Sequence, residues 1–327
     1  MGSYIWQKRY IYTTLSSRFQ YVLEQAAAQT GHKAVILIDE YDKPLLDVLE
    51  EDLEDVNRSI LKDFYGTFKA QTTRHRIMGI VNTDDMQIVF SDTPGVLKPN
   101  YKMQEMMLAF SESALADADV LLYVTDVVEN PEKNMEFLEK VQKMNIPVLL
   151  LINKIDQSNQ KDLGNIVMKW HSLLPNAEIL PISAKNKFGV DMLLKRIKEL
   201  LPESPAYFDK DQLTDKPARF FVSEIIREKI LLYYDKEIPY SVEVKVESFK
   251  EGEKSINIRA IIFVERDSQK GIIIGHQGVA LKKVGSESRK ALEKFFGKKV
   301  FLETFVKVDK DWRSSEKELD SFGYNPQ

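Results

Sequence analysis

Between residues 71 and 200, short apolar runs alternate with amphipathic segments, and this alternation constrains the fold more than any other feature. The pattern predicts an α/β domain with a doubly wound, mostly parallel sheet. In such sheets, ligands bind at the carboxyl ends of the strands. The expected strands are Ile77–Asn82, Met86–Ser91, Val120–Thr125, Pro147–Asn153 and Glu178–Ser183, and helices are expected at residues 103–116, 133–144, 162–174 and 189–200.

A first polar motif, Asp92-Thr93-Pro94-Gly95, follows the strand that ends at Ser91. A carboxylate at Asp92 could hold a magnesium ion through water, and Gly95 would let its backbone N–H approach a γ-phosphate. Upstream, the Thr73 hydroxyl could complete the magnesium coordination. We therefore predict Thr73 and Asp92 as the magnesium-binding pair of a nucleotide site.

Two further motifs follow later strands and suit recognition of a guanine base. A carboxylate in the first of them can accept two N–H bonds from a guanine edge, which adenine cannot supply, and a backbone N–H in the second would support the same base. Each motif alone is an ordinary turn or loop, but all of them in this order, each at a strand end, indicate descent from a GTPase. The predicted residues are Asn153, Lys154 and Asp156 of the first motif, and Ser183, Ala184 and Lys185 of the second.

From about Gln71 to its end, the chain resembles the Era family of ribosome-assembly GTPases. The similarity is carried by residues 71–79, the three motifs above, Phe220–Leu231, Ile238–Val242 and Val306–Trp312. It implies GTP and magnesium as cofactors, small-subunit ribosomal RNA and the small ribosomal subunit as partners, a monomer, and peripheral membrane association. Val96 follows the first motif, so no glutamine would position the attacking water.

The phosphate-binding loop of such a GTPase is missing from the sequence. P-loop GTPases carry a strand followed by GxxxxGK[ST], whose N–H groups, lysine and hydroxyl hold the phosphates and magnesium. No such stretch occurs in the 327 residues. Hydrogen bonds to charged groups contribute roughly 1.5–3 kcal/mol each, so losing about four removes on the order of 6–12 kcal/mol. We therefore predict that nucleotide binding is weak or absent and that hydrolysis is lost.

In place of that loop stand residues 1–70, which resemble predicted AAA-ATPase-like proteins over residues 12–69. The similarity rests on Val35–Pro44, which matches their Walker B strand, and on Leu61–Gly66. In such a strand Asp39 and Glu40 would bind magnesium and position water. We expect helices at residues 14–28 and 44–68, and we predict that residues 34–39 fill the vacant central strand position of the Era sheet.

The last part of the chain contains a GxxG loop, Gly275-His276-Gln277-Gly278, between an apolar turn and a helix expected at residues 279–296. Before it come a helix at 219–234 and strands at 241–249 and 255–265, and after it a strand at 299–307. This order resembles a type 2 KH domain, in which the loop clamps the backbone of about four nucleotides. The predicted RNA-binding residues are Gly275, His276, Gln277, Gly278, Lys282, Lys283, Arg289 and Lys290.

Charge supports this interpretation of the last part of the chain. Residues 270–313 carry 11 basic and 5 acidic side chains, a local charge of +6, whereas the whole chain has a net charge of −4. A local basic excess is typical of a phosphate-backbone site. The expected organisation is an AAA-ATPase-like fragment (1–70), a truncated Era-type GTPase domain (71–202), a linker (203–218) and a KH domain (219–327).

Other properties restrict the alternatives. The absence of cysteine excludes disulfides and Cys-based zinc sites, and no apolar run approaches the roughly 20 residues of a membrane helix. We therefore expect a cytoplasmic protein. Three alternatives stay open: a working GTPase with an unrecognised phosphate loop, an ATPase fragment using Asp39 and Glu40, and a non-functional fusion. The fusion itself is either a real recombination or a gene-assembly artefact.

Overall fold

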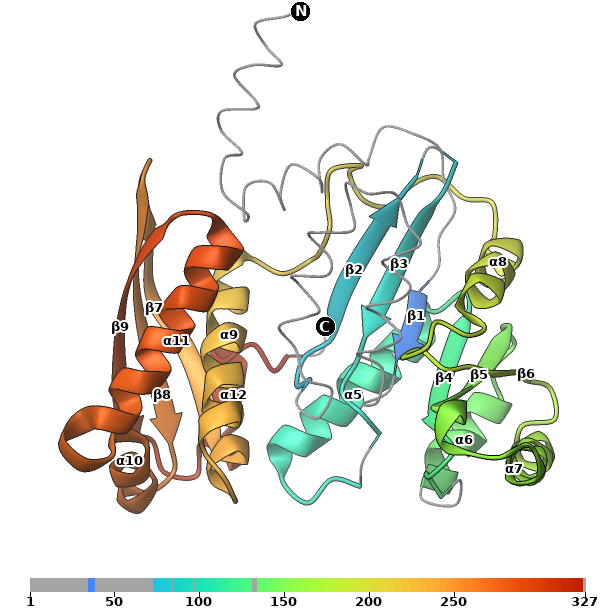
Figure 1. Cartoon of the computed structure of the whole chain (residues 1–327), viewed down its shortest axis with the longest axis horizontal. Helices are drawn as coiled ribbons and strands as arrows, with labels where there is room; N and C mark the ends of the chain where they lie inside the picture. The colour runs from blue at the N-terminus through green and yellow to red at the C-terminus, as the bar shows by residue number, and fades with distance from the viewer. Residues whose placement is uncertain (1–34, 39–72, 84, 97, 131–133, 326–327) are drawn as a thin grey trace, which may run out of the picture. The chain divides into compact units, whose positions relative to one another are not determined.

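The computed structural model describes residues 35–38, 73–83, 85–96, 98–130 and 134–325 (Figure 1). These fall into two compact units, one of residues 35–38, 73–100 and 104–215, the other of residues 101–103 and 216–325. The helices predicted at 14–28 and 44–68, and the side chains of Asp39 and Glu40, lie outside the described residues.

The first unit contains two three-stranded sheets that lie side by side, and the helices that cover them. Its elements are β1 (Val35–Ile38), β2 (Ile77–Asn82), β3 (Gln87–Asp92), α5 (Lys102–Asp117), β4 (Leu121–Asp126), α6 (Met135–Gln142), β5 (Val148–Asn153), α7 (Gln160–Leu173), β6 (Glu178–Pro181) and α8 (Val190–Leu200), with a short 3-10 helix at Ile155–Gln157.

Strand pairing in this unit follows the predicted parallel pattern with one antiparallel edge. β4, β5 and β6 pair in parallel, β2 pairs antiparallel with β3, and β1 pairs in parallel with β3, Val35 opposite Val89 and Ile38 opposite Asp92. On its other side β1 lies beside β4 (Figure 1). Residues 35–38 therefore lie between β3 and β4.

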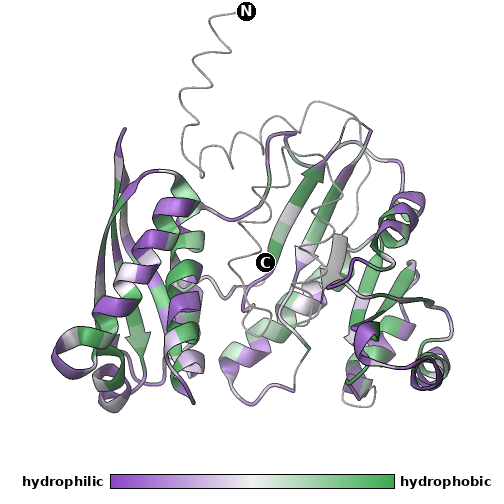
Figure 2. Ribbon diagram, in the orientation of Figure 1, coloured by the Kyte–Doolittle hydropathy of each residue, from purple (hydrophilic) through white to green (hydrophobic). Residues whose placement is uncertain are grey.

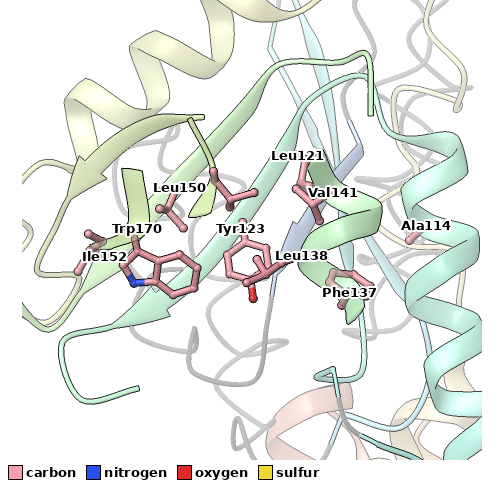
Figure 3. Packing of buried hydrophobic residues seen from close by; sticks show 10 residues of the cluster. Ala114, Leu121, Tyr123, Phe137, Leu138, Val141, Leu150, Ile152 and Trp170 are labelled. Carbon is pink, nitrogen blue, oxygen red and sulfur yellow. The ribbon is translucent and has the colours of Figure 1, made fainter. Parts of the chain in front are cut away.

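The core lies on the face of the sheet covered by α6 and α7. β5 reads Val-Leu-Leu-Leu-Ile-Asn and its middle residues are fully buried, as expected for a strand of a parallel sheet covered on both faces. Phe137, Leu138 and Val141 of α6 and Trp170 of α7 pack against this face (Figure 3). The Trp170 ring lies 5.6 Å from the ring of Tyr123. The apolar residues of each helix recur at helical spacing and form one face, which packs against the sheet.

The edge strand β2 is covered by the chain that leaves the unit. The Ile80 N–H donates to the Leu213 carbonyl at 2.8 Å, and the Met78 N–H donates to Asp215 Oδ1 at 2.8 Å. An exposed edge would invite pairing with another chain. Residues 213–215 therefore complete this sheet before the chain enters the second unit.

The second unit contains a three-stranded sheet and the helices that pack against it. Its elements are α9 (Ala218–Tyr233), β7 (Val242–Glu251), β8 (Ser255–Val264), α10 (Asp267–Ile274), α11 (Val279–Phe296), β9 (Lys299–Val308) and α12 (Glu316–Ser321), with 3-10 helices at Ile238–Tyr240, His276–Gly278 and Trp312–Ser314. The strand order is β7-β8-β9, with β7 and β8 antiparallel and β8 and β9 parallel. In Figure 2, α11 alternates between hydrophilic and hydrophobic colour, as a helix with one buried face does.

One predicted feature of this unit is wrong. The apolar segment before the GxxG loop is the helix α10, where we predicted a turn. Gln269 explains how the helix begins, because its side-chain oxygen accepts from the N–H groups of Glu265 and Arg266, both at 3.0 Å. Gly275 then ends the helix at a positive φ of 70°. The three isoleucines at its end obscured these capping signals in the sequence.

Candidate functional site

The carboxyl ends of the parallel strands gather the predicted nucleotide-binding residues at one edge of the sheet. Ile38 is opposite Asp92 across β1 and β3, and Asp126 is opposite Asn153 across β4 and β5. Because these strands run in the same direction, the loops that follow them share this edge. The three motifs therefore share one edge, although Asp92 and Lys185 are 93 positions apart in the sequence.

The two predicted magnesium-binding residues lie next to each other. The Thr73 hydroxyl donates to Asp92 Oδ2 at 3.4 Å, and Asp92 is 9% exposed. The Ser111 hydroxyl of α5 donates to the Pro94 carbonyl at 2.7 Å, which ties the loop of residues 92–95 to the helix. Within the described part of the chain, no group of three or more His, Asp or Glu side chains could hold a metal ion.

Asn153 joins the two guanine motifs. Its Oδ1 accepts from the N–H groups of Lys154 at 2.7 Å and Ala184 at 3.1 Å. The Ser183 hydroxyl donates to Asp156 Oδ1 at 2.5 Å. The Asn153 amide nitrogen is buried and has no hydrogen-bond partner among the described residues. A buried unpaired donor is costly, and a ligand with an acceptor could satisfy it.

Sequence reasoning missed Asp126, which occupies the end of β4 as Asp92 and Asn153 occupy the ends of their strands. It is 3% exposed and accepts from Lys154 Nζ at 2.6 Å and from the N–H groups of Val128 and Glu129, both at 2.8 Å. Burial raises the pKa of Asp126, but these donors outweigh it and hold the pKa below its ordinary value of 3.8. The predicted nucleotide-binding Lys154 thus pairs with a carboxylate of its own protein.

Replacing Lys154 with Met should lower the free energy of unfolding by about 1.5–3 kcal/mol, because Asp126 then loses a charged hydrogen bond. Since the pKa of Asp126 is lowered, its pairing stabilises the fold above the ordinary pKa, and this contribution disappears as the pH falls through the lower value. Chemical denaturation at neutral pH and in acid measures both effects. Lys185→Met, at an exposed position, is the matched control and should change little. Equal stability of the two variants would contradict the role of the pair.

The GxxG loop of the second unit has the backbone geometry that its glycines permit. Gly275 has φ 70° and ψ 177°, and Gly278 has φ 76°. A Cβ at Gly275 would lie 2.6 Å from the Ala280 Cβ, whereas a Cβ at Gly278 would meet nothing within 4 Å. His276 and Gln277, between them, are exposed. The loop therefore presents bare backbone at its rim, as a clamp on a sugar-phosphate chain requires.

Three of the four predicted RNA-binding cations already have partners. Lys283 Nζ lies 4.2 Å from the centre of the Tyr233 ring. Arg289 pairs with Glu293 at 3.4 Å and Lys290 with Glu287 at 2.7 Å along α11. Exposed pairs of this kind contribute little to stability, so their cations can exchange partners at low cost. The structure brings all four cations onto the helix that starts at the loop.

Tyr234 anchors the residues before the loop. Its hydroxyl donates to the Ile273 carbonyl at 2.7 Å, and burial raises the pKa of Tyr234 to about 12. Tyr234→Phe should lower the free energy of unfolding by about 0.5–1.5 kcal/mol. In the unfolded chain the tyrosine ionises near its ordinary pKa of 10.0, whereas in the folded chain it stays neutral up to about pH 12. The free energy of unfolding of the wild type should therefore fall as the pH rises from 10 to about 12, and Tyr234→Phe should lack this decrease. Denaturation at increasing pH checks this, with Tyr240→Phe, an exposed tyrosine, as control.

The fold and these motifs define a GTPase-type domain followed by a KH domain, and comparison with known proteins specifies the family. Family models match at residues 237–313 (KH domain), 56–154 (50S ribosome-binding GTPase) and 3–89 (predicted AAA-ATPase). Among solved structures, Era in complex with MgGDPNP and nucleotides 1506–1542 of 16S ribosomal RNA is 33% identical, with a TM-score of 0.79, and the match covers 90% of this chain and 99% of that one.

A variant of Aquifex aeolicus Era bound to GDP and AlF4− is 32% identical, with a TM-score of 0.78 and the same coverage. The chain belongs to the Era family of GTPases. The predicted resemblance of the first residues to AAA-ATPase-like proteins is also confirmed, by the match at residues 3–89. Among the described residues, no helix is long and apolar enough to cross a membrane.

Proposed function

We propose that this chain binds single-stranded RNA near the 3′ end of small-subunit ribosomal RNA through its KH domain and acts in ribosome biogenesis. The observation that carries the proposal is the GxxG loop, whose glycines expose backbone next to the cations of α11. The Era structure that contains a 16S ribosomal RNA fragment supports this choice of RNA. The small ribosomal subunit is then the partner, with a monomeric, cytoplasmic protein and peripheral membrane association as the family implies.

We also propose that GTP and magnesium binding is weak and that hydrolysis is impaired. In the sequence, β1 is followed by Asp39-Glu40-Tyr41-Asp42 and not by the glycine-rich loop that follows the first strand of a GTPase. Carboxylates repel a triphosphate, whereas the missing loop would supply N–H donors and a lysine. The residues on the base side and the pair of Thr73 and Asp92 suit GTP and magnesium, but on this proposal they lack the phosphate contacts that supply most of the affinity.

A related proposal concerns residues 1–70. The pairing of β1 with β3 and its position beside β4 support the idea that this fragment supplies the central strand of the Era sheet. Residues 71–327 make up 257 of the 327 residues, less than the 90% of the chain that matches Era, so the match extends into the preceding fragment. A repaired sheet without a repaired phosphate site would fold while losing nucleotide control.

A working GTPase is the second candidate, and the unpaired amide nitrogen of Asn153 favours it because that donor suits a purine acceptor. One sample measured twice separates the two candidates. A titration with labelled single-stranded RNA tests the KH domain, and a titration with a fluorescent GTP analogue and magnesium tests the nucleotide site. RNA binding without nucleotide binding supports the first candidate, and tight binding of both supports the second.

A further inference from the structure

An exposed aromatic ring lies beside the GxxG loop at the end of α9. Tyr234 faces inward and bonds to the carbonyl of Ile273, two residues before Gly275. Its neighbour Tyr233 is the last residue of α9, and its side chain is 38% exposed, whereas Tyr234 is buried. The hydrogen bond from Tyr234 therefore holds Tyr233 close to the predicted RNA clamp.

A cation shares this position. Lys283, five residues after Gly278, places its ammonium 4.2 Å from the centre of the Tyr233 ring. This distance lies within the range of a cation–π interaction. Lys283 is exposed and its stem is flexible, so the ammonium can leave the ring when a phosphate comes near. The ring and the cation are thus available together at the surface.

We propose that Tyr233 and Lys283 form a nucleobase subsite beside the GxxG loop, in which the Tyr233 ring stacks on a base of single-stranded RNA and Lys283 contacts an adjacent phosphate. The inference rests on the proposed RNA-binding function and extends the contact from the loop onto α9. Stacking on an aromatic side chain tolerates any base, because every base has a π-face. The subsite therefore adds affinity more than sequence specificity.

The charge around the pair favours RNA as the occupant. Lys282 precedes Lys283, and residues 270–313 carry the excess of 11 basic over 5 acidic side chains. The pKa of Glu287 is lowered, chiefly by its hydrogen bond from Lys290, with Lys229 and Lys283 adding to the effect. This concentration of positive charge suits a phosphate backbone better than an apolar protein surface.

The test is a fluorescence-anisotropy titration of the full chain with labelled single-stranded RNA of the small-subunit 3′-end sequence, at several salt concentrations. Tyr233→Ala should weaken binding about 5- to 100-fold without changing the salt dependence, and Tyr233→Phe should bind as the wild type does. Lys283→Gln should lower the salt slope by about 1, because one phosphate contact is lost. Tyr240→Ala, at a tyrosine of the same domain that is 51% exposed, is the matched control.

The outcomes separate this inference from the function on which it rests. A wild-type chain that does not bind RNA overturns the proposed function. A wild-type chain that binds, together with Tyr233→Ala of equal affinity, overturns only the subsite. Tyr233→Ala is also introduced into the Lys283→Gln variant. If Tyr233→Ala lowers the salt slope of the wild type but does not weaken RNA binding of the Lys283→Gln variant, the ring only positions the lysine and the stacking role is wrong. Retained binding in Tyr233→Phe shows that the ring and not the hydroxyl makes the contact, and thermal denaturation of Tyr233→Ala shows whether that variant is folded.

Discussion

Replacing both Gly275 and Gly278 with Asp should weaken RNA binding by at least about 100-fold, the loss expected when two charged hydrogen bonds of about 1.5 kcal/mol disappear. The two carboxylates would repel the phosphates that the bare loop admits. Their side chains would also hold the RNA backbone away from the loop. Anisotropy with the same labelled RNA measures the loss.

The two positions differ in what a side chain would meet, and this difference shapes the experiment. At Gly275 a Cβ would clash with Ala280, so the double variant can also disturb the fold. At Gly278 a Cβ meets nothing within 4 Å, and Asp tolerates a positive φ better than most residues do. Gly278→Asp alone should therefore bind RNA poorly in a folded domain.

The matched control is Gly271→Asp. Gly271 is an exposed residue of α10, and a Cβ there would meet nothing within 4 Å, so this variant introduces the same charge outside the loop and should bind RNA far better. RNA affinity in the double variant equal to that of the wild type would contradict the KH assignment.

Nucleotide affinity should be at least about four orders of magnitude lower than in an Era protein that has its phosphate loop. On our proposal about four charged hydrogen bonds are lost, and they correspond to roughly 6–12 kcal/mol. The base-side contacts of Asn153 and Asp156 do not replace them. Titration with fluorescent GTP and ATP analogues in the presence of magnesium, next to an intact Era protein, measures the difference.

Asp156→Ala provides the decisive comparison for that titration. Asp156 is exposed and its carboxylate accepts a hydrogen bond from the Ser183 hydroxyl, so the substitution should leave the fold intact. If nucleotide binding is as weak as we expect, the variant and the wild type behave alike. Micromolar binding of the GTP analogue that Asp156→Ala removes would show a working guanine site and overturn our proposal. Preference for the ATP analogue would instead favour the AAA-ATPase-like fragment.

Much of the fold could be predicted because it depends on local patterns. The apolar runs of β2 and β5 and the helical spacing of α8 and α11 appear in short windows of sequence, and the observed elements begin or end within a few residues of the predicted ones. β6 ends two residues early, at Pro181, because the Ser183 backbone pairs with Phe188. The helix α10 was missed because the three isoleucines at its end show no helical period.

The sequence by itself determined the Era relationship, the three strand-end motifs, the GxxG loop and the absence of a phosphate-binding motif, because each of these depends on residue type and spacing along the chain. Only the tertiary structure decided which distant residues meet. Lys154 pairs with Asp126, Asn153 accepts a hydrogen bond from the Ala184 N–H, and the Tyr234 hydroxyl donates to the Ile273 carbonyl just before the GxxG loop. These contacts join residues 28 to 39 positions apart. They depend on strand register and helix packing, which no local pattern records.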